Sequence, residues 1–157
     1  MKPNNNRPKD NPNNFFARNI RDKGEDFLDH MDMTNDQLQI QAIIVFRDMV
    51  KGKIDIPKYT RYFCDPRIIS AFTIAANTKY QLYSISYNGI SALIREYLRD
   101  GITVTPDIKN IENYYAACAD AYAMILDAFN ALSSTNNITI LQNLVYNIRT
   151  KNYRYNV

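Results

Sequence analysis

Residues 106–132 have the sequence PDIKNIENYYAACADAYAMILDAFNAL, and their spacing predicts one long helix. Thr105-Pro106-Asp107 is a typical helix start. A heptad seam follows it, with a row of mostly small side chains alongside. The seam comprises Ile108, Ile111, Tyr115, Cys118, Tyr122, Ile125, Phe129 and Leu132, and the second row Tyr114, Ala117, Ala121, Met124, Ala128 and Ala131. We expect this helix, about 40 Å long, to be covered on nearly every side because it is apolar around most of its girth.

Shorter helical patterns lie on both sides of this segment. Thr34 and Gln37 form a capping-box pair, and Asp65 followed by Pro66 is typical of an N-cap with proline at the first helical position. Residues 53–63 contain Pro57 and predict a connector with one helical turn. Further helices are predicted over 15–30, over 35–50, from Pro66 onward and over 138–150. A loop at 133–137 is expected between the 106–132 helix and the 138–150 helix.

Residues 79–89, KYQLYSISYNG, are ambiguous. Apolar and small polar side chains alternate there as in a strand, but both flanks are helical and a lone strand would have no partner. We therefore predict helix, with a possible break at Asn88-Gly89 and a stop at Gly101. The predicted fold class is all-α, a compact bundle of five or six helices around the 106–132 helix.

The chain divides into an extended basic arm over 1–14, a helical domain over 15–150 and a basic aromatic tail over 151–157. The arm, MKPNNNRPKDNPNN, has almost no apolar groups and cannot form a core of its own. Ordering fourteen residues costs on the order of 20 kcal/mol. A neighbouring subunit could offset that cost through backbone hydrogen bonds and charge pairing.

Catalytic chemistry finds little support in the sequence. The only histidine, His30, lies in EDFLDHMDM, where Asp26 shares its helix face; a metal site there is weighed against a solvated acidic face, which is favoured. The four glycines are isolated, which excludes a Gly-rich phosphate loop, and Cys118 on the seam is expected to be a small buried apolar residue. We predict no catalytic residue, no cofactor and no metal ligand, and hence no enzyme.

Basic and aromatic residues are interleaved in KYTRYF (58–63) and KNYRY (151–155). Such segments can neutralise phosphates and stack on bases, but Tyr and Arg are also favoured at protein interfaces. Because the formal net charge is only +3 and no DNA-binding motif is present, a protein interface is favoured. The sequence contains no run of eighteen apolar residues that would predict a membrane span, so we expect a soluble protein with no membrane partner.

Taken together, the arm, the 106–132 helix and the tail resemble the head-tail connector or ring proteins of tailed bacteriophages, those of crAss-like phages in particular. Abundant Asn, Ile and Tyr with few Gly, the residue usage of an AT-rich genome, agree with this resemblance. It implies a structural subunit of the virion, assembled in the host cytoplasm as a homo-oligomeric ring and joined to portal or tail proteins, with transient DNA contact. The interface candidates are Arg7, Lys9, Phe15, Phe16, Lys58, Tyr59, Arg61, Tyr62, Tyr153, Arg154 and Tyr155.

Two alternatives remain open. The first is a small nucleic-acid-binding or genome-packaging protein, similar to a small terminase subunit, which would bind DNA through residues such as Arg61 and Arg154. The second is a helical enzyme that uses the acidic cluster between Glu25 and Asp32.

Overall fold

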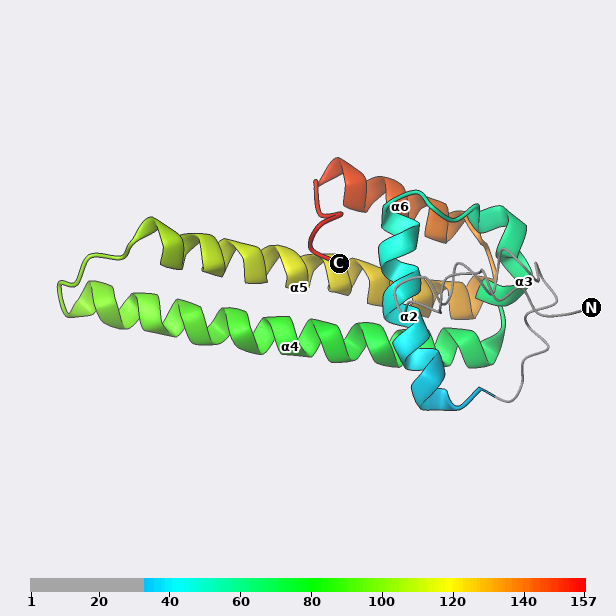
Figure 1. Ribbon diagram of the computed structural model, residues 1–157, viewed down its shortest axis with the longest axis horizontal. Helices are drawn as coiled ribbons and strands as arrows, with labels where there is room; N and C mark the ends of the chain where they lie inside the picture. The colour runs from blue at the N-terminus through cyan, green and yellow to red at the C-terminus, as the bar shows by residue number, and fades with distance from the viewer. Residues whose placement is uncertain (1–32) are drawn as a thin grey trace, which may run out of the picture.

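The computed structural model describes residues 33–157, and within that range the chain is all-α with no β-strand (Figure 1). The arm over 1–14, the predicted helix over 15–30 and the candidates Arg7, Lys9, Phe15 and Phe16 lie outside the described residues. The elements are α2 (Asn35–Val50), the 3-10 turn η3 (Ile56–Tyr59), α3 (Thr60–Phe63), α4 (Pro66–Arg99), α5 (Pro106–Thr135) and α6 (Thr139–Thr150).

Helix α2 has the predicted bounds because both of its ends are fixed by local hydrogen bonds. The Gln37 amide donates to Thr34 Oγ1 at 3.1 Å, and the Thr34 amide donates to Gln37 Oε1 at 2.8 Å, which completes the capping box. At the other end Gly52 has a φ of 74°, a left-handed conformation that favours glycine. The Gly52 and Lys53 amides donate back to the last turn in a Schellman motif.

Helix α4 is longer than the sequence pattern indicated. Asp65 Oδ1 accepts a hydrogen bond from the Arg67 amide at 2.8 Å, and this predicted N-cap is confirmed. The possible break at Asn88-Gly89 is wrong, because the helix continues to Arg99 and packs along α5. Gly101, with a φ of 73°, ends it through a second Schellman motif, in which the Ile102 amide donates to the Tyr97 carbonyl at 2.8 Å.

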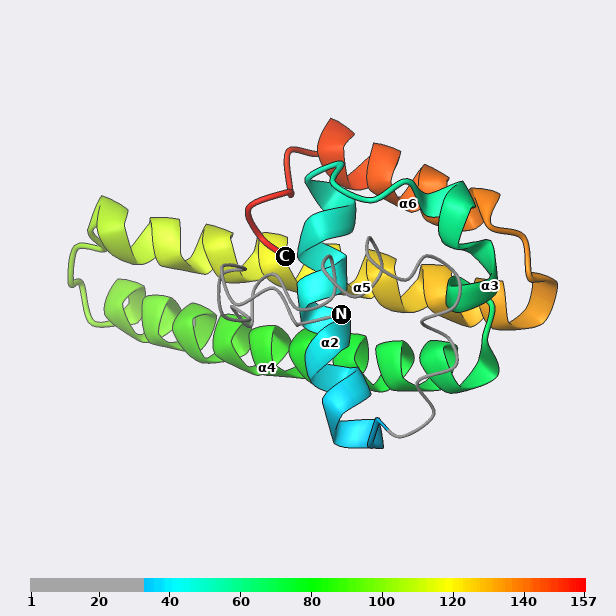
Figure 2. The ribbon, with the colours of Figure 1, turned by 45° about the vertical axis from the view of Figure 1, so that its right-hand side comes forward.

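Helix α5 extends beyond the predicted end and includes Ser133–Thr135, so the expected loop at 133–137 is reduced to the residues around Asn136, which has a φ of 52°. Helices α4 and α5 form a long antiparallel hairpin (Figures 1 and 2). Helix α2 packs on α4 and α6, while α6 packs on α5. The free end of the hairpin projects past the other helices (Figure 1).

The core contains an aromatic cluster formed by α2, α3, α4 and α5. Phe46 of α2, Phe72 of α4 and Phe129 of α5 have ring centroids 5.4 to 5.7 Å apart. Tyr62 and Phe63 of α3 pack against Phe72 at 5.9 and 6.5 Å. Each of these five side chains is at most 1% exposed, so this cluster anchors the body of the molecule.

The expectation that α5 is covered on nearly every side is wrong for its N-terminal part. The seam is buried from Cys118 to Leu132, but Ile111 is 44% exposed and Tyr114 of the second row 49%. The cause is length: α5 has 30 residues, whereas α2 has 16 and α6 has 12. At 1.5 Å per residue, α5 is ~45 Å long against ~24 Å for α2 and ~18 Å for α6, so these two helices cannot cover its whole length. Only α4, with 34 residues, runs along all of α5 within the described residues.

Candidate functional site

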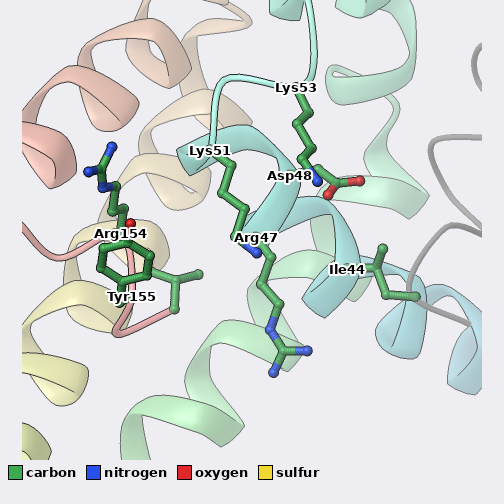
Figure 3. Close-up of a pocket in the computed structure, with 8 residues that line it drawn as sticks. Ile44, Arg47, Asp48, Lys51, Lys53, Arg154 and Tyr155 are labelled. Carbon is green, nitrogen blue, oxygen red and sulfur yellow. The ribbon is translucent and has the colours of Figure 1, made fainter.

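A basic pocket of about 440 Å³ lies between the end of α2 and the C-terminal tail (Figure 3). Two arginines and two lysines contribute to its wall, together with one acidic and three other side chains. The lining residues are Ile44, Arg47, Asp48, Lys51, Lys53, Arg154, Tyr155 and Val157. Its volume falls within the range typical of small-ligand sites.

The end of α2 positions three of the cations. Arg47 lies in the last turn and points toward α4 (Figure 3), while Lys51 and Lys53 flank Gly52 in the turn that follows. Backbone amides of residues 51 to 53 already bond the last carbonyls of α2, so the two lysine side chains are not needed as caps. The Arg149 guanidinium of α6 also lies beside this turn, because a Cβ built on Gly52 would be 3.1 Å from Arg149 Nη1.

The tail forms the opposite wall and is held against α5 and α6. Asn152 has a φ of 60°, which reverses the chain, and the Tyr153 amide then donates to the Ile148 carbonyl at 2.9 Å. Asn156 Nδ2 contacts Cys118 Sγ at 3.6 Å. The Arg154 guanidinium lies 5.0 Å from the centroid of the Tyr155 ring, which is 70% exposed.

The pocket carries an excess of positive charge. Within residues 33–157, no carboxylate lies within 4.0 Å of the side-chain nitrogens of Arg47, Lys51, Lys53 or Arg154; the ion pairs of that range are formed elsewhere. Asp48 is 7% exposed and is the only acidic side chain among the lining residues. This arrangement suits the binding of an anion, and the pocket lining contains no Ser, Thr, Cys or His side chain.

The second candidate surface is the distal hairpin, which we define as residues 82–114. Eleven large apolar side chains are exposed within the described part of the chain, and seven of them lie in the distal hairpin: Leu82, Ile85, Tyr87, Leu98, Ile102, Ile111 and Tyr114. Their exposed fractions range from 36 to 70%. Ile94 is the one apolar side chain of this region that is buried, and it lies outside the main core cluster.

A hydrogen bond between Ser91 of α4 and Glu112 of α5 joins the two helices of the distal hairpin, and Lys109 of α5 also bonds Glu112. Ser91 Oγ donates to Glu112 Oε2 at 2.7 Å, and Lys109 Nζ donates to Glu112 Oε1 at 2.6 Å. Hydrogen bonding from Lys109, with Ser91 second, lowers the pKa of the Glu112 carboxyl and keeps it ionised. The contact between the two helices of the hairpin therefore includes the buried Ile94 and the Ser91–Glu112 hydrogen bond, while seven large apolar side chains remain exposed.

Tyrosines gather where the hairpin leaves the body. The rings of Tyr83 and Tyr122 stack with centroids 5.9 Å apart, and Tyr115 lies 6.3 Å from Tyr83. Burial raises the pKa of Tyr122, and the nearby Arg47 guanidinium opposes that shift. A hydrogen bond with Cys118 is the main reason why the pKa of Tyr114 is raised to about 12. The cluster lies at the base of the distal hairpin, and Arg47 of the basic pocket is near enough to influence the pKa of Tyr122.

The predicted interface residues do not all lie on the surface. Tyr59 and Tyr62 are 5% and 0% exposed and belong to the core, so their assignment to an interface is corrected: the short η3 and α3 helices turn both rings inward. Lys58 and Arg61 are exposed. In the tail, Tyr153 is half-buried, whereas Arg154 and Tyr155 line the basic pocket.

Sequence reasoning missed Arg47, Lys51 and Lys53, although the KGK triplet after a predicted helix end was a usable signal.

Residues 33–157 contain no group of three or more His, Cys, Asp or Glu side chains placed to bind a metal, and the Glu25–Asp32 cluster lies outside them. No helix within the same range has the length and apolar character needed to span a membrane. No protein-family model, curated protein or solved structure matches the chain.

Proposed function

We propose that this chain is a non-enzymatic structural subunit of a homo-oligomeric assembly, in which neighbouring copies cover the distal hairpin. The observation that carries the proposal is the concentration of exposed apolar side chains over residues 82–114. Large contiguous apolar surfaces are uncommon on monomers and indicate interaction sites.

A partner that covers the exposed apolar side chains of the distal hairpin would be stabilised by their burial. Complete burial of a Leu or Ile side chain contributes about 1.5 to 3 kcal/mol, and Leu82, Ile85 and Leu98 are each more than half exposed. Leu82 and Ile85 lie three positions apart on one side of α4, so a single partner chain can cover both and gain about 2 to 3 kcal/mol. In such an assembly the 106–132 helix would become the covered, central helix that its sequence predicts.

The finer proposal is a ring-forming head-tail connector of a phage virion, in contact with portal or tail proteins. The arm over 1–14 is its clasp. Deletion of residues 1–14 should leave a folded helical chain that fails to enter the assembly. Normal assembly of that truncation would contradict the clasp.

Sedimentation velocity at micromolar concentration tests the hairpin surface. The variant L82E/I85E should sediment as a smaller species than the wild type, because two charges replace two exposed apolar groups. The matched control is I40E/Y146E, which makes the same change at side chains 65% and 69% exposed outside the hairpin. An equal effect of both variants, or no effect of either, would count against the proposed surface.

The genome-packaging alternative is favoured by one observation, the basic pocket. Salt dependence of DNA binding separates it from a purely structural role, because phosphate contacts weaken steeply with salt.

A further inference from the structure

We propose that the basic pocket binds the phosphodiester backbone of single-stranded nucleic acid and that the exposed Tyr155 ring stacks on one of its bases. This inference goes beyond the structural role and does not depend on it. The pocket would act as a nucleic-acid contact on a subunit whose apolar hairpin contacts protein.

The positive charge of the pocket is the first observation that supports this proposal. The formal net charge of the whole chain is only +3, yet four cationic side chains line this one pocket and a fifth, Arg149, lies beside its Gly52 turn. Like charges repel, and within the described residues Arg47, Lys51, Lys53 and Arg154 have no carboxylate within 4.0 Å to compensate them. A polyanion would supply that compensation and release its own counterions.

The composition of the pocket favours nucleic acid over an acidic protein. Lysine is depleted at protein interfaces, whereas both lysine and arginine neutralise phosphates. Two of the four lining cations are lysines. The lining offers little aliphatic surface for a protein partner, because its aliphatic members are Val157 and Ile44, and Ile44 is only 8% exposed.

The rim of the pocket provides a stacking surface. Tyr155 is 70% exposed, and the Arg154 guanidinium lies over its ring at 5.0 Å. An aromatic ring beside cations is the combination that single-strand binding proteins use, since a base can stack on the ring while phosphates contact the cations. Stacking of this kind requires an unpaired base, so a single strand should bind more tightly than a duplex.

The walls are built to hold this geometry. One wall is the Schellman turn of α2 and the other is the tail, which hydrogen bonds fasten to Ile148 and Cys118. The cations therefore project from a fixed frame, although they come from residues about one hundred positions apart in the chain.

Fluorescence anisotropy with a labelled twelve-nucleotide oligothymidylate tests the proposal on the full chain between 50 and 300 mM salt. The variant K51Q/R154Q removes two pocket cations, and R95Q/R99Q removes two exposed cations from the distal hairpin as a matched control. Each lost phosphate contact lowers the salt slope by ~0.7 for a single strand. We expect a slope smaller by about 1.4 and at least tenfold weaker binding for K51Q/R154Q, and an unchanged slope for the control.

Tyr155→Ala should weaken binding about fivefold or more without a change in slope, because it removes stacking and leaves the charges. A duplex of the same sequence should bind less tightly than the single strand, and inorganic phosphate at matched ionic strength should not displace the oligonucleotide. Circular dichroism of each variant establishes that the fold is retained.

Four results would overturn the proposal. They are undetectable binding by the wild type at 50 mM salt, equal losses in the pocket and control variants, displacement of the oligonucleotide by micromolar inorganic phosphate, and tighter binding of an acidic peptide such as residues 24–33 of this chain, GEDFLDHMDM.

Discussion

The body of the molecule and the distal hairpin are built from the same two helices but are stabilised differently. In the body, the C-terminal half of α5 and the first half of α4 bury aromatic rings against α2, α3 and α6. In the distal hairpin, within residues 33–157, the two helices pack on each other, with Ile94 buried and Ser91 hydrogen-bonded to Glu112. Apolar content is therefore not sufficient for burial: a helix is covered only as far as its neighbours reach.

The largest expected effect is loss of an aromatic ring from the body. Phe72 is fully buried and contacts four other rings, so Phe72→Ala should lower the free energy of unfolding by about 3 to 5 kcal/mol. Ile85→Ala, at a side chain 70% exposed in the distal hairpin, should change it by less than ~0.5 kcal/mol. Urea unfolding measures both, and similar losses would contradict the division into body and hairpin.

Substitution of glycine by alanine should change the free energy of unfolding in opposite directions in the two regions. Gly52 has a φ of 74° and would place a Cβ 3.1 Å from Arg149 Nη1, so Gly52→Ala should destabilise the body by about 1 to 2 kcal/mol. Gly89 lies mid-helix with nothing within 4 Å of a built Cβ, and Gly89→Ala should stabilise the chain by up to about 1 kcal/mol. Thermal unfolding of the pair is the measurement. A lower melting temperature for Gly89→Ala would contradict this expectation and would show that another group approaches position 89 closely.

The smallest expected effect is on the stability of the distal hairpin at low pH. Because the folded pKa of Glu112 is lowered from 4.5, its ionised form contributes stability above that pH, and the contribution disappears as the pH falls through the lower folded value. Glu112→Gln should therefore lower the melting temperature at pH 7 and have less effect at pH 3. A difference between wild type and variant that is constant across this range would exclude the hydrogen-bonded carboxylate as the cause.

Local signals in the sequence determine much of this fold. The capping box at Thr34 and the glycine at 52 were sufficient to predict both ends of α2. Asp65-Pro66 was sufficient to predict the start of α4. The continuity of α4 through Asn88-Gly89 depends on packing against α5, which no local pattern contains.

The candidate site was predicted in part. Arg154 and Tyr155 were recognised from their interleaved pattern, but the same pattern misassigned Tyr59 and Tyr62, whose direction depends on the short helices that carry them. The pocket itself brings together residues 47–53 and 154–157, and their proximity depends on tertiary packing. The exposure of the distal hairpin likewise depends on the lengths of other helices.

The central claim is that the distal hairpin is covered by another copy of this chain. Native mass spectrometry tests it most directly, since one copy has a mass of 18.2 kDa. We predict a species whose mass is a defined multiple of that value at micromolar concentration, reduced to a smaller multiple by L82E/I85E. A single species of 18.2 kDa at every concentration examined would contradict the account.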